Sequence, residues 1–218
     1  MKLMKSFLAV SFAILVSACN KDKIRGSGDV ISEVRNVTGF TGVVVNGSTK
    51  AFINIGTAFT VTVKGYKTLL PFLETNIKNS VLEVAFSNNV TVNNDNTEIY
   101  ITLPLLDYVQ TNGIGDMTIT GEVTGSGHLK ASVNGSARIS VEKGSADEFE
   151  GAISGNGKIL ALGFQCKEAN VNISGDGDIE IAVSDTLAVT ISGNGKVYYR
   201  GTPLITTDIS GSGQVIPK

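Results

Sequence analysis

Several residue types that support common binding and catalytic chemistries are scarce in this sequence. Tryptophan is absent and aromatic residues make up 6%, so no aromatic platform for stacking bases or sugars is expected. Histidine occurs once and cysteine twice, which argues against a zinc site. Charged residues make up 17%, and 18 basic residues face 20 acidic ones, so no basic surface for nucleic acid is expected.

Proline is also scarce, whereas glycine is abundant. Only 4 prolines but 25 glycines occur in 218 residues, and hydrophobic residues make up 42%. This composition favours many short strands joined by tight turns over a disordered chain. The length fits one ordinary domain that can bury a core without disulfides.

The first residues have the composition of an export signal. Residues 1–19 are MKLMKSFLAVSFAILVSAC, with basic Lys2 and Lys5 followed by an apolar run over residues 6–16. Such a run is too short to span a bilayer and is typical of a secretory signal peptide. We therefore expect residues 1–18 to be a signal peptide and the remaining chain to act outside the cytoplasm.

The end of this segment resembles the lipobox of bacterial lipoproteins, because the small residues Ser17 and Ala18 precede Cys19. The resemblance implies cleavage after Ala18 and acylation of Cys19 with fatty acids such as palmitate, which would anchor the protein stably to a membrane. Asn20, in place of an aspartate, favours the outer membrane by analogy with sorting rules in some Gram-negative bacteria. Residues 19–29 are then a lipidated tether. The alternative is an ordinary signal peptide followed by a chance cysteine.

Internal repeats dominate residues 105–218. Each unit is an alternating strand, a glycine turn and a second alternating strand, with a period of about 18–22 residues. Aligned on their glycines, the units are VQTNGIGDMTIT from Val109, ASVNGSARISVE from Ala131, GAISGNGKILAL from Gly151, VNISGDGDIEIA from Val171, VTISGNGKVYYR from Val189 and TDISGSGQVIPK from Thr207.

Corresponding positions of these units keep their chemistry. One mostly aliphatic column precedes the turn and another follows it, while short polar residues and glycines form the turn itself. The pattern predicts an all-β solenoid, a parallel β-helix in which each repeat covers the apolar interior of the last. The columns are Thr111, Val133, Ile153, Ile173, Ile191 and Ile209; Met117, Ile139, Ile159, Ile179, Val197 and Val215; Asn112, Asn134, Ser154, Ser174, Ser192 and Ser210; and Gly113, Gly135, Gly155, Gly175, Gly193 and Gly211.

A further column is charged and is expected to face solvent. Opposite charges on adjacent strands are mildly stabilising, so this column needs no ligand to explain it. Its members are Asp116, Arg138, Lys158, Asp178, Lys196 and Gln214.

Residues 30–104 form a less regular N-terminal β portion in which the repeat is not visible. Strands are expected at 41–46, 51–55, 59–64, 81–86 and 98–103, with a short helical turn within 68–75 that Pro71 limits in length. A covering of the solenoid end is a sufficient reason for this portion, which together with residues 105–218 makes one structural domain.

The chain resembles the bacterial family called putative auto-transporter adhesin, head GIN domain. Three features carry the resemblance: Asn36-Val37-Thr38-Gly39-Phe40 before the first long strand, the Leu103-Pro104-Leu105 step into the repeats, and the recurrent Ser-Gly-x-Gly turns. The resemblance covers about residues 30–216 and implies a right-handed β-helix with a suggested role in adhesion. It supplies no catalytic residues, and a fold does not by itself define an activity.

Three side chains are candidates for site chemistry. The single histidine, His128, lies in a glycine-rich segment without a nucleophile motif, so a surface turn is expected instead of a catalytic triad. Cys166, between strands, is expected to be a buried and inert thiol. Asp176, in Ser174-Gly175-Asp176-Gly177-Asp178, faintly resembles a calcium-binding turn, but the other units hold no carboxylate at this position, so a plain turn is favoured while calcium stays open.

The leading functional hypothesis is a non-enzymatic, lipid-anchored binding or adhesion module of the cell envelope, with no catalytic residues, cofactor or metal. A glycan or a protein at the cell surface is the expected ligand, and the oligomeric state stays undefined. A structural or assembly component of the envelope is the alternative. A polysaccharide-active enzyme is disfavoured, because Asp116 and Asp178 would lie about three rungs, or ~14 Å, apart, too far for a glycosidase pair.

Overall fold

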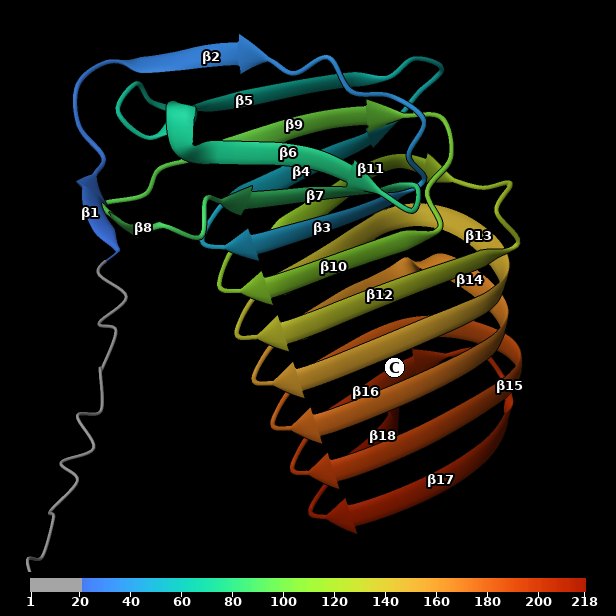
Figure 1. The fold of residues 1–218 in the computed structure, drawn as a ribbon. Helices are drawn as coiled ribbons and strands as arrows, with labels where there is room; N and C mark the ends of the chain where they lie inside the picture. The colour runs from blue at the N-terminus through green and yellow to red at the C-terminus, as the bar shows by residue number, and fades with distance from the viewer. Residues whose placement is uncertain (1–20) are drawn as a thin grey trace, which may run out of the picture.

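The structure, a computed structural model, describes residues 21–218 as a ladder of strands wound into a parallel β-helix (Figure 1). This confirms the predicted fold class. One 3₁₀ turn, η1 (Leu70–Phe72), interrupts the strands. The strands are β1 (Asp22–Arg25), β2 (Val30–Val34), β3 (Gly42–Gly47), β4 (Lys50–Ile55), β5 (Thr60–Tyr66), β6 (Leu73–Lys78), β7 (Val81–Phe86), β8 (Val90–Asn93), β9 (Glu98–Leu103), β10 (Tyr108–Gly113), β11 (Met117–Val123), β12 (His128–Gly135), β13 (Arg138–Gly155), β14 (Lys158–Gly175), β15 (Asp178–Gly193), β16 (Lys196–Arg200), β17 (Leu204–Gly211) and β18 (Gln214–Pro217).

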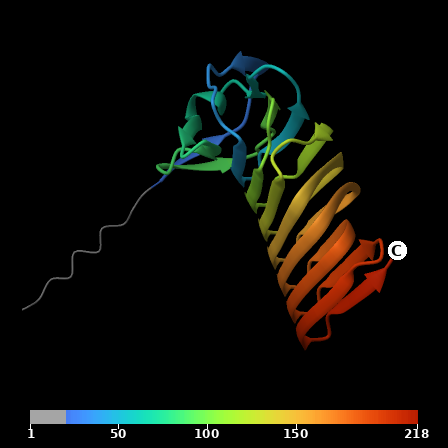
Figure 2. The same ribbon diagram turned by 90° about the vertical axis from the view of Figure 1, so that its right-hand side faces the viewer.

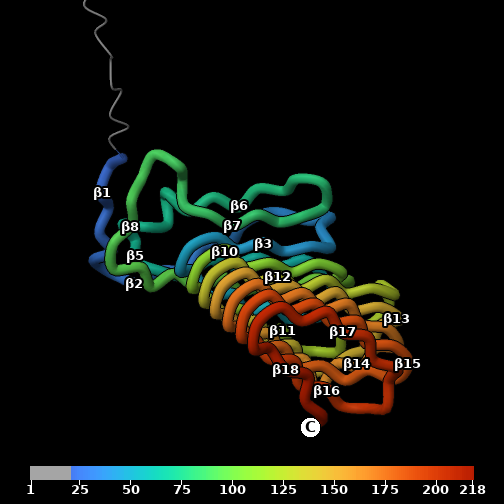
Figure 3. The backbone as a smooth tube through the Cα atoms, turned by 90° about the horizontal axis from the view of Figure 1, so that it is seen from below, coloured from blue at the N-terminus to red at the C-terminus, as the bar shows by residue number. Residues whose placement is uncertain are grey.

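Each turn of the solenoid contributes one strand to each of two parallel β-sheets. The upstream sheet holds the strands that run into the glycine turns: β3, β10, β12, the second halves of β13 to β15, and β17. The downstream sheet holds the strands that leave those turns: β4, β11, the first halves of β13 to β15, β16 and β18. The long strands β13 to β15 bend from the downstream into the upstream sheet, and from below the coils superpose around a shared interior (Figure 3).

The predicted columns are confirmed as stacked rows. Thr111 is paired with Val133, and the same row continues through isoleucines to Ile209, all buried except Ile209 in the last rung, which is 38% exposed. The row that begins with Met117 is buried as far as Val197. Burial of these side chains on both sides by neighbouring rungs supplies the main stabilisation of the solenoid.

The glycine turns bring successive rungs into backbone contact. Gly155 has φ 120°, and a Cβ there would lie 2.5 Å from the carbonyl oxygen of Gly135. Both the backbone conformation and the close approach therefore require glycine at this row.

The ladder extends further toward the N-terminus than the sequence repeat indicates. Asn46 is paired with Asn112 and Gly47 with Gly113, so β3 and β4 form a rung of the same kind as β10 and β11. Beyond this rung, β7 and β9 continue the two layers in parallel. At the edge of the upstream sheet, β6 pairs antiparallel with β7. At the edge of the downstream sheet, β5 pairs antiparallel with β9, and β2 pairs antiparallel with β5. The expected helical turn is η1, with Pro71 in its first turn.

Part of the predicted tether belongs to the folded domain instead. β1 pairs in parallel with β8, and the backbone N–H of Ser27 donates to Thr68 Oγ1 at 3.0 Å. The expectation of a tether through residue 29 therefore fails for residues 22–29, because these backbone hydrogen bonds hold the segment on the domain. Cys19 and the predicted signal peptide lie outside the described residues. Within residues 21–218, no helix is long and apolar enough to cross a membrane.

The two ends of the solenoid differ. Within residues 21–218, β17 pairs only with β15, and β18 only with β16. Most of β17 is exposed, including Leu204 at 74%, whereas the opposite end is filled by large buried side chains such as Phe40 and Leu70. The C-terminal rung of the described chain thus leaves its interior partly open to solvent.

Candidate functional site

The upstream sheet presents a flat face of short polar side chains, which we call the polar face. Its strands stack along a straight line when the ladder is seen from the side (Figure 2). Hydroxyl and amide groups dominate it, and Lys130 and Glu150 pair with one another at 2.5 Å. From β10 to β17 its outward side chains are Tyr108, Gln110 and Asn112; Lys130, Ser132 and Asn134; Glu150, Ala152 and Ser154; Asn170, Asn172 and Ser174; Ala188, Thr190 and Ser192; and Thr206, Asp208 and Ser210.

At the N-terminal end of this face, five polar side chains form one hydrogen-bonded chain, the amide cluster: Asn46, Tyr108, Gln110, Asn112 and Asn134. The Tyr108 hydroxyl donates to Gln110 Oε1, and Gln110 Nε2 donates to Asn112 Oδ1 at 2.7 Å. Asn112 Nδ2 donates to Asn46 Oδ1, and Asn134 Nδ2 donates to Asn112 Oδ1, both at 2.8 Å. These bonds orient the amides before any ligand arrives and leave each amide with unused hydrogen-bonding capacity.

Tyr108 is held in the cluster by the strand beside it. Gly42 is its partner on β3, and a Cβ on Gly42 would lie 3.2 Å from the Tyr108 ring, so the missing side chain leaves room for the ring. Burial raises the pKa of the Tyr108 phenol, with a smaller contribution from Glu150 and an opposing one from Lys130. The hydroxyl therefore remains a hydrogen-bond donor at neutral pH.

Two cavities lie over this end of the polar face. One, of about 370 Å³, is lined by the outer sides of β3, β7 and β10 together with the turn between β6 and β7. The other, of about 500 Å³, lies over β3, β6 and β7. Asn46 and Glu83 line both cavities, which are therefore neighbours.

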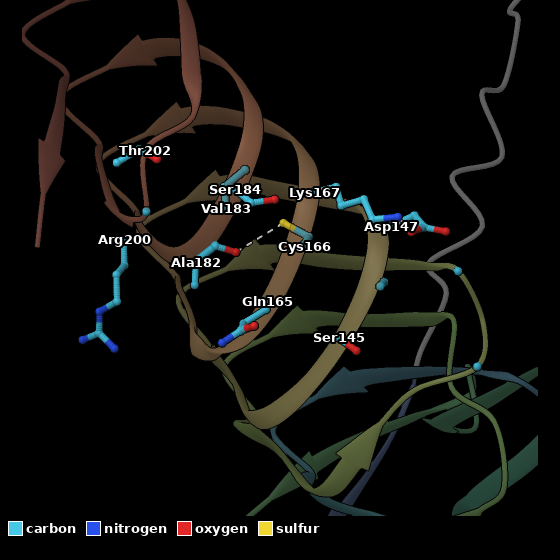
Figure 4. Close-up of a pocket in the computed structure, with 14 residues that line it drawn as sticks. Ser145, Asp147, Gln165, Cys166, Lys167, Ala182, Val183, Ser184, Arg200 and Thr202 are labelled. Atoms are coloured by element: carbon cyan, nitrogen blue, oxygen red, sulfur yellow. Dashed lines mark hydrogen bonds and ion pairs between the residues drawn. The ribbon is translucent and has the colours of Figure 1, made fainter.

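A larger groove, of about 650 Å³, follows the bends of the long strands on another side of the solenoid (Figure 4). Cys166, Ala182 and Val183 are buried in its floor. At its rim, Lys167 and Asp147 pair at 2.7 Å, an exposed pair that raises the pKa of the Lys167 ammonium through its hydrogen bond to the carboxylate. Figure 4 shows these two side chains pointing outward. Beside this apolar floor, the groove is also lined by the polar side chains of Ser145, Gln165, Ser184, Arg200 and Thr202.

Cys166 has the inert character that its sequence context predicts, although it lies within β14 and not between strands. It is 4% exposed, and its thiol lies 3.5 Å from the carbonyl oxygen of Ala182. Burial raises the pKa of this thiol to about 12. At neutral pH the thiolate, the nucleophilic form, is therefore almost absent.

The other sequence candidates are dispersed over the surface. His128 begins β12 beside Glu148 and, with Glu150, Asn170 and Asn172, borders a cavity of about 310 Å³ on the polar face. The carboxylate of Asp176 accepts a hydrogen bond from Asn194 Nδ2 at 2.8 Å. Among residues 21–218, no three His, Cys, Asp or Glu side chains gather closely enough to hold a metal ion.

The charged column forms two ion pairs on the downstream sheet. Lys158 Nζ lies 2.9 Å from Asp178 Oδ2, and the hydrogen bond to this carboxylate raises the pKa of the Lys158 ammonium. Arg138 Nη1 lies 4.0 Å from Asp116 Oδ2. Asp116 and Asp178 stand three rungs apart, each beside a cation, and do not form a common site.

The sequence did not single out the amide cluster. The repeat pattern marks Asn112 and Asn134 only as turn starts, and its columns do not include Asn46, Tyr108 or Gln110. A signal for Asn46 exists in the recurring Asn-Gly pair at 46–47, 112–113 and 134–135. The pairing of Tyr108 and Gln110 with residues of β3 becomes evident only in the fold.

The family model described as putative auto-transporter adhesin, head GIN domain, matches residues 39–203. The chain belongs to this family, as its turns and repeats indicate. No curated protein matches the chain.

Solved structures share the fold at low sequence identity. A putative adhesin from Bacteroides fragilis aligns with a TM-score of 0.70 at 19% identity, over 89% of this chain and 100% of that one. A putative adhesin from Parabacteroides merdae aligns with a TM-score of 0.59 at 18% identity, over 90% and 99%. A Parabacteroides distasonis protein described as a putative lipid binding protein also has a TM-score of 0.59 at 18% identity, over 90% and 100%. These likenesses establish the architecture alone.

Proposed function

We propose that this protein is a non-enzymatic binding module of the cell envelope that mediates adhesion through its polar face. The observation that carries the proposal is the amide cluster, in which five polar side chains are oriented on a rigid ladder beside two cavities. Groups fixed on paired strands lose little conformational freedom when a ligand binds. Membership in the family described as putative auto-transporter adhesin, head GIN domain, supports the same role.

The proposed position is the outer membrane, where acyl chains on Cys19 would hold the domain. The basic, apolar and small residues of 1–19 support export and lipidation. Because β1 begins at Asp22, few residues would separate the lipid from the domain, which would then stay close to the membrane surface.

An assembly role in the envelope is a second candidate, favoured by the open end of the solenoid. Among the described residues, no strand pairs with the outer edge of β17, and Leu204, its first residue, is 74% exposed. Exposed strand edges can pair with another chain. Against this, Pro217 and Lys218 lie in and after β18, where they disfavour strand addition.

Surface display and adhesion can be tested together in the source cells. Antibody against the domain should label intact cells, and cells that produce the protein should adhere to glycan- or matrix-coated surfaces more strongly than cells that lack it. A Cys19→Ser chain should lose acyl label and leave the membrane fraction. Labelling only after permeabilisation would contradict the adhesion role and favour assembly inside the envelope.

A further inference from the structure

We infer that the two cavities beside the amide cluster form adjoining subsites for a neutral glycan. This inference rests on the proposed function and deepens it, because it gives the polar face a ligand class. The residues that carry it lie on three adjacent strands, β7, β3 and β10, at the N-terminal end of that face.

The first subsite has an apolar floor. Val44 lies in the outward row of β3, yet it is only 8% exposed. Its strand partners are Glu83 on β7 and Gln110 on β10, whose longer side chains stand on either side of it. Val81 and Tyr108 line the same cavity. A pyranose ring has apolar C–H faces and hydroxyls around its edge, so this floor suits a ring face.

The walls of this subsite supply hydrogen-bonding groups. Glu83 and Gln110 are two strand spacings apart, ~10 Å between their backbones, which leaves room for a ring between them. A sugar hydroxyl both donates and accepts hydrogen bonds, and so does a primary amide. The side chains of Gln110 and Asn46 can therefore each donate a hydrogen bond to a sugar hydroxyl or accept one from it. Their existing hydrogen bonds hold them in place.

The turn between β6 and β7 forms a firm outer wall. Asn79 and Ser80 have φ values of 51° and 61°, and Lys78 pairs directly with Val81. Two consecutive positive φ values in a two-residue loop are typical of a type I′ hairpin turn, which matches the strand twist. The wall is therefore part of the sheet and not a loose loop.

The charge around the cavities favours a neutral ligand. Glu83 takes part in none of the ion pairs within residues 21–218, and Glu74 lines the second cavity near it. In the part of the chain that the structure describes, Lys78 is the single cation lining either cavity. Two carboxylates against one ammonium repel sulfated or uronic acid residues, whereas a free carboxylate accepts hydrogen bonds from sugar hydroxyls.

The shared border of the cavities predicts the length of the ligand. Because Asn46 and Glu83 line both cavities, adjoining sugar residues can occupy them at once. Linked residues bind as one unit, so an oligosaccharide should bind at least about tenfold more tightly than its monosaccharide.

The inference can be tested by calorimetry with the purified full chain. The probes are the hexasaccharides of cellulose, starch, β-mannan and chitin, their monosaccharides, and a heparin hexasaccharide as the acidic comparison. At least one neutral hexasaccharide should bind. Gln110→Ala and Glu83→Ala should each weaken that binding about tenfold or more, since each removes direct hydrogen bonds. Gln214→Ala and Glu168→Ala, which change the same residue types far from the cavities, should leave it unaltered, and all four variants should keep the parent unfolding temperature.

Each other outcome overturns the inference. Binding of the heparin fragment alone would exclude the neutral class. Equal weakening of binding by Gln110→Ala and Gln214→Ala would show that the binding site is not at the two cavities. If no neutral probe binds, a neutral glycan is excluded as the ligand. If none of the neutral probes binds while cells that carry the protein still adhere to protein-coated surfaces, the adhesion role stands without this ligand class. Loss of adhesion to every surface would remove the proposed function itself.

Discussion

The thiol of Cys166 shows how burial sets side-chain chemistry at the level of a single residue. Desolvation raises its pKa from 9.0 to about 12. Its environment in the groove floor is apolar, and the thiol donates a hydrogen bond to the carbonyl oxygen of Ala182. The thiol is therefore a packing group and not a nucleophile at neutral pH.

This pKa leads to a prediction about reactivity and stability. In the native chain at pH 8, alkylation of Cys166 by iodoacetamide should be about 1000-fold slower than in the chain unfolded by guanidinium chloride. The reason is that the raised pKa lowers the fraction of thiolate, the form that reacts, by the same factor. A Cys166→Ser chain, measured in parallel, corrects for reaction at Cys19. Because the folded pKa exceeds the unfolded one, the unfolded chain loses its proton first, and the free energy of unfolding should fall as pH rises from 9.0 toward about 12. Rapid native alkylation would show that the floor of the groove opens.

Single residues also explain why the candidate site could not be predicted. Asn46 accepts a hydrogen bond from Asn112 in a cluster whose other members all lie more than sixty residues later in the chain, the separation from Asn112 being 66 residues. The repeats themselves follow at 22, 20 and 18 residues. A column built on the short period therefore omits Asn46, and only the fold places it beside Asn112.

At the scale of elements, the rung made by β3 and β4 lies directly against the rung made by β10 and β11, but in the sequence β5 to β9 are inserted between them. This insertion supplies the second pair of ladder strands and the antiparallel strands that cover them. The repeats from β10 onward have no insertion, so their interior rows could be predicted residue by residue. The rows of Thr111 and Met117 were predictable because each position faces the same environment in every rung.

The glycine turn is the element whose tolerance is most sharply defined. Gly155→Ala should reduce the free energy of unfolding by at least about 3 kcal/mol. Alanine would be strained at the φ of 120° that residue 155 adopts, and its Cβ would lie 2.5 Å from the carbonyl oxygen of Gly135. Gly127→Ala is the matched control: φ is 70° and nothing lies within 4 Å of the added Cβ, so a loss of about 1 kcal/mol is expected. Urea denaturation of both variants measures the difference. Equal losses would mean that the rungs can move apart to admit a methyl group.

At the scale of the whole described structure, residues 21–218, antiparallel strands flank the first rungs of the solenoid, whereas no strand of this range pairs beyond the last rung. Toward the N-terminus, β2, β5 and β6 complete the layers with antiparallel pairing. Toward the C-terminus, β17 and β18 each pair on one side only. Since each rung is stabilised mainly by its neighbours, local stability should decline toward the open end.

Amide hydrogen exchange should therefore show a gradient along the ladder. Amides of β17 and β18 should exchange at least about 100-fold faster than those of β14, which is paired on both sides, because the last rung can open without disturbing the others. The amides of β3 and β10, which carry the amide cluster, should be protected like β14, since parallel strands flank both of them. Such a pattern would place the candidate site in the rigid part of the molecule and the freely opening rung away from it. Uniform protection from β3 to β18 would instead show that the rungs unfold as one cooperative unit, in which the uncovered end is no weaker than the interior.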